Sequence, residues 1–293
     1  MTRFILDSGN PDDYRTTLEL FNNNDQTLWG STTNPSLIAK KLAEDGHKLT
    51  LQKAFDLQKD IIKEILTIVP GAVSAEVYAD NSTTSEDMIK QGKEIVKWDE
   101  RVVIKLPTTI EGFKARTQLR KENVVTNNTL VFSQQQIYAI CLHEHLLQNE
   151  FQVKGKWPCF ISPFLGRLDD IGEDGITLVR NGMELKKHFT EELWMLSASI
   201  RSTSHLKACI ELGSELITAP LSVYKDWLEG SAQPIQEQKL VSLDRWEVPT
   251  QVKEIQTLDN FFEAIENKTL DISHPLTDKG VDKFTKDWKA ILT

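Results

Sequence analysis

A single lysine stands inside the most apolar strand-like run of the sequence. Lys105 follows two valines and an isoleucine and precedes Leu106 and Pro107, within the run RVVIKL at 101–106. Burial disfavours the charged form of an amine, so a lysine in such a strand is partly neutral near neutral pH. A neutral amine can attack a ketone carbonyl and form a Schiff base. The same position also suits a strand-edge lysine that reaches solvent, or one half of a structural ion pair.

Two carboxylates are the natural partners of this lysine. Asp7 ends the first apolar run, and Glu76 lies within the third. Charges inside buried strands are costly unless they are paired or functional. A lysine between two carboxylates is therefore either a structural network or a nucleophile with a general acid/base pair.

Polar residues also stand at the ends of other apolar runs. Arg167 and Arg201 follow two of the later runs, and arginine suits bidentate binding of phosphate. Taken singly, either arginine is also typical of a surface salt bridge. The remaining polar residues at such ends are Ser31, Thr32, Thr33, Asn34, Asn127, Asn128, Thr129, Ser162 and Ser199.

Short β-rich runs alternate with longer helical patterns along the chain. The predicted strands are 4–7, 28–32, 73–77, 101–106, 124–131, 160–164, 193–200 and 216–219. The predicted helices between them are two in 37–68 and one each in 85–96, 110–120, 134–147 and 206–212. Apolar strands separated by amphipathic helices predict a parallel sheet covered by helices. About eight such units suit a closed (β/α)8 barrel, and an open doubly wound sheet is the alternative.

The part after residue 220 shows no further strand unit. It predicts a helical C-terminal extension, about 221–293, with helices at 260–266 and 282–292 that pack on the outside of the barrel. Pro234 and the stretch 248–250 predict irregular connections. No linker rich in Gly, Ser or Pro divides the chain, so we expect one domain over 1–293, an α/β TIM barrel with extra C-terminal helices.

Charge and composition argue against several classes of protein. The net charge of -9 argues against a nucleic-acid partner, which needs a basic face. No apolar run approaches the length that spans a membrane, and the N-terminus does not read as a signal peptide. The isolated Cys141, Cys159 and Cys209 are typical of reduced thiols in a cytoplasmic protein.

No metal or cofactor site is expected. His143 and His145 are two positions apart in a predicted helix and do not share a face. They are expected to be ordinary histidines on the helix surface.

Seven segments, taken together and in this order, resemble the transaldolase family. They are FILDSG (4–9), GSTTNPSLI (30–38), SAEV (74–77), VVIKLPTTIEGFKA (102–115), NNTLVFS (127–133), ISPFLGR (161–167) and ASIRS (198–202). The part beyond residue 220 carries little of the resemblance.

The resemblance implies a (β/α)8 barrel of the class I aldolase type, and a transferase of aldehyde or ketone residues that needs no cofactor. Such enzymes move a dihydroxyacetone unit from sedoheptulose 7-phosphate or fructose 6-phosphate to glyceraldehyde 3-phosphate or erythrose 4-phosphate, in the pentose phosphate pathway. Their partners are thus phosphorylated sugars, and homo-oligomers, here most simply a dimer, are expected.

The resemblance also implies catalytic roles for four residues. Lys105 matches the Schiff-base lysine, and Asp7 matches the general acid/base of carbon–carbon cleavage. Glu76 and Thr129 match the pair that positions the water of imine formation and hydrolysis.

The implied substrate contacts fall into three groups. The hydroxyls of the dihydroxyacetone unit would be held by Asn34, Asn127 and Ser162. The phosphate would be bound by Arg167, Ser199 and Arg201. Thr32 matches a pocket threonine near the acid/base.

Two alternatives to a transaldolase remain. Related fructose-6-phosphate aldolases release dihydroxyacetone and tend to carry Tyr where this chain has Phe164, so Phe164 and the length of 293 residues favour transfer. The other alternative is a non-catalytic barrel that binds sugar phosphates. The presence of Lys105, Asp7 and Glu76 argues against this alternative.

Overall fold

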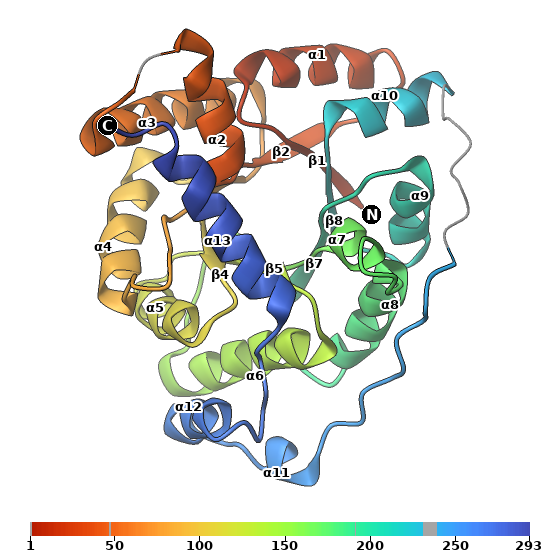
Figure 1. Cartoon of the computed structure of the whole chain (residues 1–293). Coiled ribbons are helices and arrows are strands. Elements are labelled where there is room, and N and C mark those ends of the chain that lie inside the picture. Colours follow the sequence, from red (N-terminus) through yellow and green to blue (C-terminus); the bar gives the residue numbers. More distant parts are fainter. Residues whose placement is uncertain (1, 47, 191, 231–238) are drawn as a thin grey trace.

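Eight parallel strands close into a barrel in the order of the sequence, β1 to β8 (Figure 1). The computed structural model describes residues 2–46, 48–190, 192–230 and 239–293. The closed order confirms the predicted (β/α)8 barrel and excludes the open doubly wound sheet. The strands are β1 (Arg3–Asp7), β2 (Leu28–Thr32), β3 (Val73–Glu76), β4 (Val102–Pro107), β5 (Thr126–Val131), β6 (Cys159–Pro163), β7 (Leu193–Ser197) and β8 (Leu216–Ala219).

Two strands are shorter than the apolar pattern predicts by two residues or more. The strand expected over 193–200 ends at Ser197, because Ser199 has a φ of 56° and leaves the extended conformation. The strand expected over 124–131 begins at Thr126, after a turn in which Asn123 has a φ of 61°. A left-handed residue interrupts the pleat of a strand, and Leu130 with a φ of 59° does so inside β5, where the pairing with β6 is irregular. The apolar pattern does not reveal such residues.

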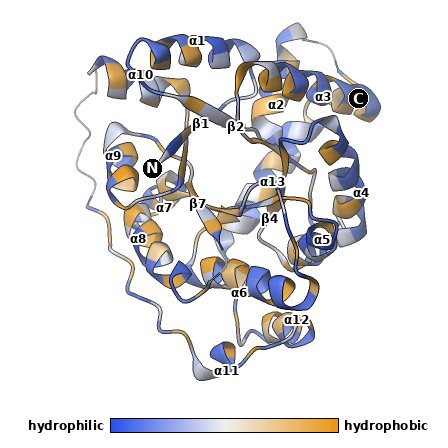
Figure 2. Ribbon diagram, turned by 180° about the vertical axis from the view of Figure 1, so that it is seen from behind, coloured by the Kyte–Doolittle hydropathy of each residue, from blue (hydrophilic) through white to orange (hydrophobic). Residues whose placement is uncertain are grey.

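Helices surround the barrel on its outer side. The residues that the longer helices bury are mostly hydrophobic, and orange and blue residues mix along helices such as α1 and α6 in the view from behind (Figure 2). The helices up to β8 are α1 (Pro11–Asn22), α2 (Pro35–Leu42), α3 (Leu51–Ile68), α4 (Ser85–Ile95), α5 (Ile110–Lys121), α6 (Gln134–Phe151), α7 (Leu165–Asp169), α8 (Gly175–Lys186) and α9 (Thr203–Glu211), with 3₁₀ turns at Ala43–Asp45 and Val96–Trp98.

The sequence pattern missed several helices. Among them are α1, α7, α8, α10 (Leu221–Glu229) and α11 (Thr250–Lys253). In α1 only Pro11, Tyr14, Thr17 and Phe21 are buried, so the apolar stripe is too sparse to mark a helix. Pro234 lies outside the described residues.

The C-terminal helices do not all pack on the outside. Helix α12 (Leu258–Glu266) does, and its Phe261 packs against Phe113 of α5. Helix α13 (Pro275–Lys289) instead crosses the mouth of the barrel, at the end where the strands finish (Figure 1). The side-chain hydroxyl of Thr277 at its start donates a hydrogen bond to the carbonyl of Leu130 in β5, 2.9 Å away. The expectation of outside packing is therefore wrong for α13, because local periodicity does not specify what a helix covers.

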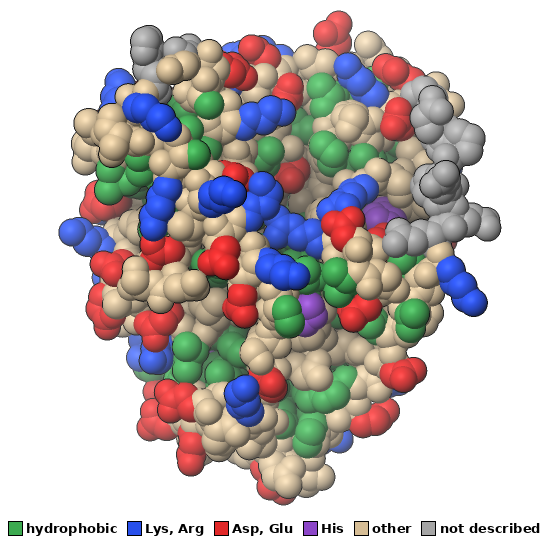
Figure 3. Space-filling view, in the orientation of Figure 1, with side chains coloured by type: hydrophobic (Ala, Val, Ile, Leu, Met, Phe, Trp, Pro, Cys, Tyr) green, Lys and Arg blue, Asp and Glu red, His purple; other side chains and the backbone are tan. Residues whose placement is uncertain are grey.

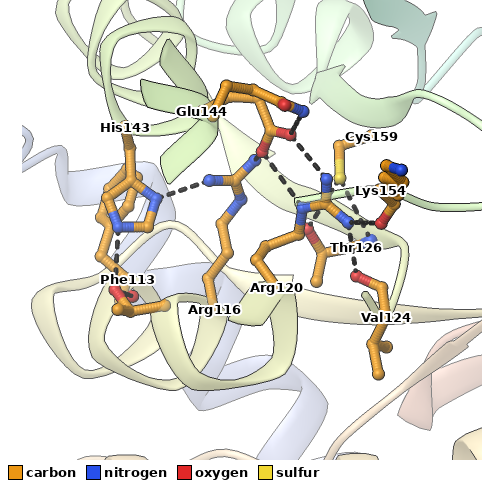
Figure 4. Close-up of polar contacts among 11 residues, drawn as sticks. Phe113, Arg116, Arg120, Val124, Thr126, His143, Glu144, Lys154 and Cys159 are labelled. Atoms are coloured by element: carbon orange, nitrogen blue, oxygen red, sulfur yellow. Dashed lines mark hydrogen bonds and ion pairs between the residues drawn. The ribbon is translucent and has the colours of Figure 1, made fainter. Parts of the chain in front are cut away.

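His143 is not a surface histidine. It is fully buried between α5 and α6, where its Nδ1 lies 2.5 Å from a guanidinium nitrogen of Arg116 (Figure 4). Glu144 binds both Arg116 and Arg120, at 2.5 and 2.7 Å. Burial raises the pKa of Glu144, but the two arginines outweigh this and lower it to about 2. His145, two residues on, is half-buried.

Within the described ranges, no helix is both long and apolar enough to cross a membrane. The same residues contain no group of three or more His, Cys, Asp or Glu side chains arranged to hold a metal ion.

Candidate active site

The amine of Lys105 lies inside the barrel, beside the carboxylate of Glu76. Strands β3 and β4 pair in the register that sets Glu76 next to Lys105. The Nζ atom of Lys105 is 3.0 Å from Oε2 of Glu76, and both side chains are 4% exposed. Nζ also donates to the carbonyl of Thr33, 3.1 Å away. The lysine is therefore the buried half of an ion pair, and it does not reach solvent.

Asp7 faces the same lysine from the end of β1. Its Oδ1 accepts a hydrogen bond of 2.8 Å from the hydroxyl of Thr32, which also lies 2.6 Å from the hydroxyl of Thr218. Burial raises the pKa of Asp7, and Lys105, Thr32 and Arg167 oppose this rise. Burial likewise raises the pKa of Glu76 against the opposing charge of Lys105. A carboxyl with a raised pKa is suited to accept and return a proton near neutral pH.

A cavity of about 100 Å³ lies above these groups. Eight of the twelve predicted site residues line it, together with three that were not predicted. The predicted ones are Asp7, Thr32, Asn34, Lys105, Ser162, Phe164, Arg167 and Ser199, and the others are Leu196, Ala198 and Thr218. The side chain of Asn34 also caps α2, because its Oδ1 accepts from the backbone N–H of Leu37 at 3.0 Å.

The other four predicted residues do not line this cavity. Glu76 reaches it only through its contact with Lys105. Asn127 is buried behind Ser162, whose hydroxyl donates to its Oδ1 at 2.7 Å. Thr129 is fully buried, and its hydroxyl has no hydrogen-bond partner among the described residues. Arg201 lies outside the cavity.

The two predicted phosphate arginines differ in their surroundings. Arg167 lines the cavity, its guanidinium lies 5.1 Å from the ring of Phe164, and burial lowers its pKa. Arg201 forms a bidentate ion pair with Asp170, whose Oδ2 is 2.7 Å from one guanidinium nitrogen. The side chain of Arg201 is 49% exposed. A Cβ atom at Gly166 would lie 2.5 Å from the carbonyl oxygen of Ser199, so only glycine lets the start of α7 approach the backbone that follows β7.

Two residues near the site, Thr218 and Phe284, were not predicted from the sequence. Thr218 stands near the end of β8, so the rule that polar residues at strand ends form the site could have found it. Phe284 of α13 has its ring centre 6.0 Å from Nζ of Lys105. No local pattern marks it, because it comes from a helix 179 positions beyond the lysine (284 − 105).

The arrangement combines three chemical groups in one small space. It holds a buried primary amine, carboxylates with raised pKa values, and a cation with no ion pair or hydrogen bond to any described residue. An amine of this kind can form a covalent imine with a carbonyl compound while a neighbouring carboxyl transfers protons. The free guanidinium of Arg167 suits an anionic end of the same molecule.

Comparisons with known proteins agree with this geometry. The family model described as transaldolase/fructose-6-phosphate aldolase matches residues 4–293. A protein of Brachyspira hyodysenteriae named "Probable transaldolase" is 32% identical over 289 residues, covering 99% of this chain and 98% of its own length. One of the same name from Methanococcus maripaludis is 34% identical over 261 residues, with 89% and 87% coverage.

The match extends further than the sequence motifs suggest. It includes the segment beyond residue 220, for which little resemblance was expected. A "Probable transaldolase" of Clostridium botulinum, 32% identical over 289 residues, also covers 99% of this chain and 99% of its own length. The chain belongs to the transaldolase/fructose-6-phosphate aldolase family.

Proposed function

We propose that this protein is a transaldolase of the pentose phosphate pathway. It transfers a dihydroxyacetone unit from sedoheptulose 7-phosphate or fructose 6-phosphate to glyceraldehyde 3-phosphate or erythrose 4-phosphate. The observation that carries the proposal is the buried amine of Lys105, 3.0 Å from Glu76, in a cavity that Asp7 and Arg167 also line.

In this proposal Lys105 forms the Schiff base with the keto carbon of the donor. The protonated imine then accepts the electron pair of the breaking carbon–carbon bond, and an enamine remains on Lys105. Asp7 takes the proton of the donor's C4 hydroxyl, and its raised pKa supports this role. Addition of the enamine to an acceptor aldehyde reverses these steps.

Glu76 and Thr129 position the water that leaves on imine formation and returns on hydrolysis. The contact of Glu76 with Lys105 supports the role of Glu76. The hydroxyl of Thr129 has no hydrogen-bond partner among the described residues. This supports the role of Thr129, because a buried hydroxyl without a partner is costly unless water or substrate binds it.

The remaining residues hold the substrate. Asn34, Asn127 and Ser162 bind the hydroxyls of the dihydroxyacetone unit, and Thr32 orients Asp7 through its hydrogen bond of 2.8 Å. Arg167, Ser199 and Arg201 bind the phosphate. For Arg201 this requires that a phosphate compete with Asp170 for its guanidinium, because that carboxylate now holds it.

Transfer is favoured over release of free dihydroxyacetone because the residue at position 164 is Phe. Phe164 lines the cavity and brings no hydroxyl that could order water or protonate the enamine. A fructose-6-phosphate aldolase, the second activity in the family's description, is the alternative. Release of dihydroxyacetone from fructose 6-phosphate as fast as transfer would identify the protein as that enzyme.

We further infer a cytoplasmic protein that acts as one domain and as a homo-oligomer, in the simplest case a dimer. The three cysteines are buried and form no disulfide among the described residues, which is typical of a reducing compartment. The packing of α12 and α13 on the barrel supports a single domain.

Two measurements test the function. A coupled assay with sedoheptulose 7-phosphate and glyceraldehyde 3-phosphate should show transfer. Incubation with fructose 6-phosphate and borohydride should add a three-carbon mass to Lys105. The absence of any adduct on Lys105 would favour a barrel that only binds sugar phosphates.

A further inference from the structure

The ring of Phe284 lies near both ends of the candidate site. Phe284 is 4% exposed, and its ring centre lies 6.0 Å from Nζ of Lys105 and 5.3 Å from the guanidinium carbon of Arg167. One apolar ring therefore faces both the amine and the cation. A substrate that bonds to Lys105 and reaches Arg167 therefore comes close to this ring, which does not itself line the cavity.

Helix α13 is fixed to the segments that directly follow three site residues. The hydroxyl of Thr277 donates to the carbonyl of Leu130, and that of Thr285 donates to the carbonyl of Ala79, each at 2.9 Å. Asp287 accepts a hydrogen bond from the hydroxyl of Ser36. The three partners lie one, three and two residues beyond Thr129, Glu76 and Asn34 in the sequence.

The helix also lies close against two side chains of the barrel. A Cβ atom at Gly280 would lie 2.5 Å from a methyl carbon of Leu130 and 3.0 Å from a guanidinium nitrogen of Arg167. A side chain at Gly280 would have to displace the ends of Leu130 and Arg167, so the glycine allows close contact between α13 and the barrel. Phe284 lies one helical turn further along, and the hydrogen bonds of Thr277 and Thr285 hold this part of α13 in place.

The position of the ring bears on the fate of the enamine. To release dihydroxyacetone, the enamine carbon takes a proton that derives from water, and the resulting iminium adds water and expels the lysine amine. The overall change consumes one water and gives free Lys105 and dihydroxyacetone. Transfer needs no water at this stage, because the enamine carbon bonds to the acceptor aldehyde.

We propose that Phe284 is a specificity-determining residue, which excludes water from the three-carbon unit on Lys105 and so favours transfer over release. The proposal rests on the proposed transaldolase function. It adds a residue from α13 to the site and assigns to this helix the role of a roof. The rival explanation is that Phe284 only packs in the apolar core.

Three variants separate these explanations. Phe284→Ala removes the roof, and Phe284→Leu keeps an apolar side chain but opens the space that the ring fills. Phe261→Leu is the matched control, because Phe261 is also buried and also belongs to the C-terminal helices but packs against Phe113 and His143. Each full-length variant is given fructose 6-phosphate and erythrose 4-phosphate, and free dihydroxyacetone and sedoheptulose 7-phosphate are measured together.

The expected result is a rise in the ratio of dihydroxyacetone to sedoheptulose 7-phosphate. We expect on the order of tenfold for Phe284→Ala and less for Phe284→Leu, with no change for Phe261→Leu. If Phe284→Ala does not fold, Phe284→Leu decides. An unchanged ratio in folded Phe284→Leu, or an equal rise in Phe261→Leu, would overturn the proposal.

Borohydride trapping distinguishes this failure from failure of the proposed function. A wild-type protein that forms the adduct on Lys105 and transfers, while the Phe284 variants keep its ratio, refutes only the role of Phe284. A wild-type protein that forms no adduct refutes the Schiff-base function and, with it, this inference.

Discussion

The Nζ atom of Lys105 and the carboxylate of Glu76 are 3.0 Å apart, and neither side chain is exposed beyond 4%. Removing such a pair from water is costly. Breaking the buried pair is also costly, because either partner alone is an uncompensated charge. Burial raises the pKa of Glu76 even with the lysine present. The pair therefore keeps an amine in contact with a carboxyl group whose pKa is raised, an arrangement suited to proton movement at the amine.

Replacement of the lysine should abolish catalysis and also weaken the fold. Lys105→Met should give no transfer and no borohydride adduct. Breaking a buried ion pair typically costs about 3–5 kcal/mol, and denaturant unfolding would measure this loss.

The loss of stability in Lys105→Met should depend on pH in a defined direction. A buried Glu76 without the lysine has its pKa raised further, so its folded form prefers the proton. Stability should then be greatest below the ordinary value of 4.5 and fall as the pH rises through the folded pKa. The variant Lys105→Met/Glu76→Gln should lose this slope, and a slope that persists would show that Glu76 is not the responsible group.

Asp7 should act after the imine has formed. Asp7→Asn removes the proton acceptor of carbon–carbon cleavage, so transfer should fall by about 10²–10⁴. The donor should still condense with Lys105, and borohydride should then trap a six-carbon sugar phosphate instead of a three-carbon unit. Mass spectrometry of the adduct distinguishes the two.

The control for this variant is Asp12→Asn, because Asp12 is 76% exposed and pairs with Arg15 on the surface. It should leave both the rate and the adduct unchanged. A three-carbon adduct of normal yield in Asp7→Asn would remove Asp7 from the cleavage step.

Arg167 should contribute more to phosphate binding than Arg201. Charge-assisted hydrogen bonds contribute about 1.5–3 kcal/mol, so Arg167→Ala should raise KM for fructose 6-phosphate by about tenfold to hundredfold. Arg201→Ala should raise it less, since Asp170 already holds that guanidinium. Steady-state kinetics with fructose as the unphosphorylated donor provide the control, because neither variant should change its KM. A larger effect of Arg201→Ala would place the phosphate outside the cavity.

Stability should fall in mild acid because of His143. Burial, followed by the nearby Arg116 and Arg120, holds the pKa of His143 well below its usual 6.5. Between the lowered folded pKa and the unfolded value, the unfolded chain binds a proton that the folded one does not. The free energy of unfolding therefore decreases as the pH falls below about 6.5, by up to ~1.4 kcal/mol per pH unit.

Denaturant unfolding between pH 7 and pH 5 measures this slope. The variant His143→Gln should reduce it, because it removes the titrating group. The matched variant His145→Gln, on the same helix but half-buried, should retain it. Equal slopes in both variants would assign the acid sensitivity to another group.

The strands and the reactive residues on them could be read from the sequence. Continuous apolar runs are typical of parallel strands that helices cover. All eight predicted segments agree with the observed strands to within three residues at either end. Lys105, Asp7 and Glu76 stood out because a charge in such a run needs a partner. The barrel then brings the strand ends together, and eight of the twelve proposed residues line one cavity.

Other features depended on contacts between distant segments. Hydrophobic periodicity predicts a helix over 282–292, and α13 (Pro275–Lys289) covers most of that range. The pattern does not show that α13 crosses the barrel mouth and brings Phe284 near Lys105. It also does not show that His143 is buried, or that Asp170 holds Arg201. A residue's type and its near neighbours determine local conformation and the cost of burial. The packing of the whole chain decides which distant segment contacts a given residue, and only the tertiary structure contains that information.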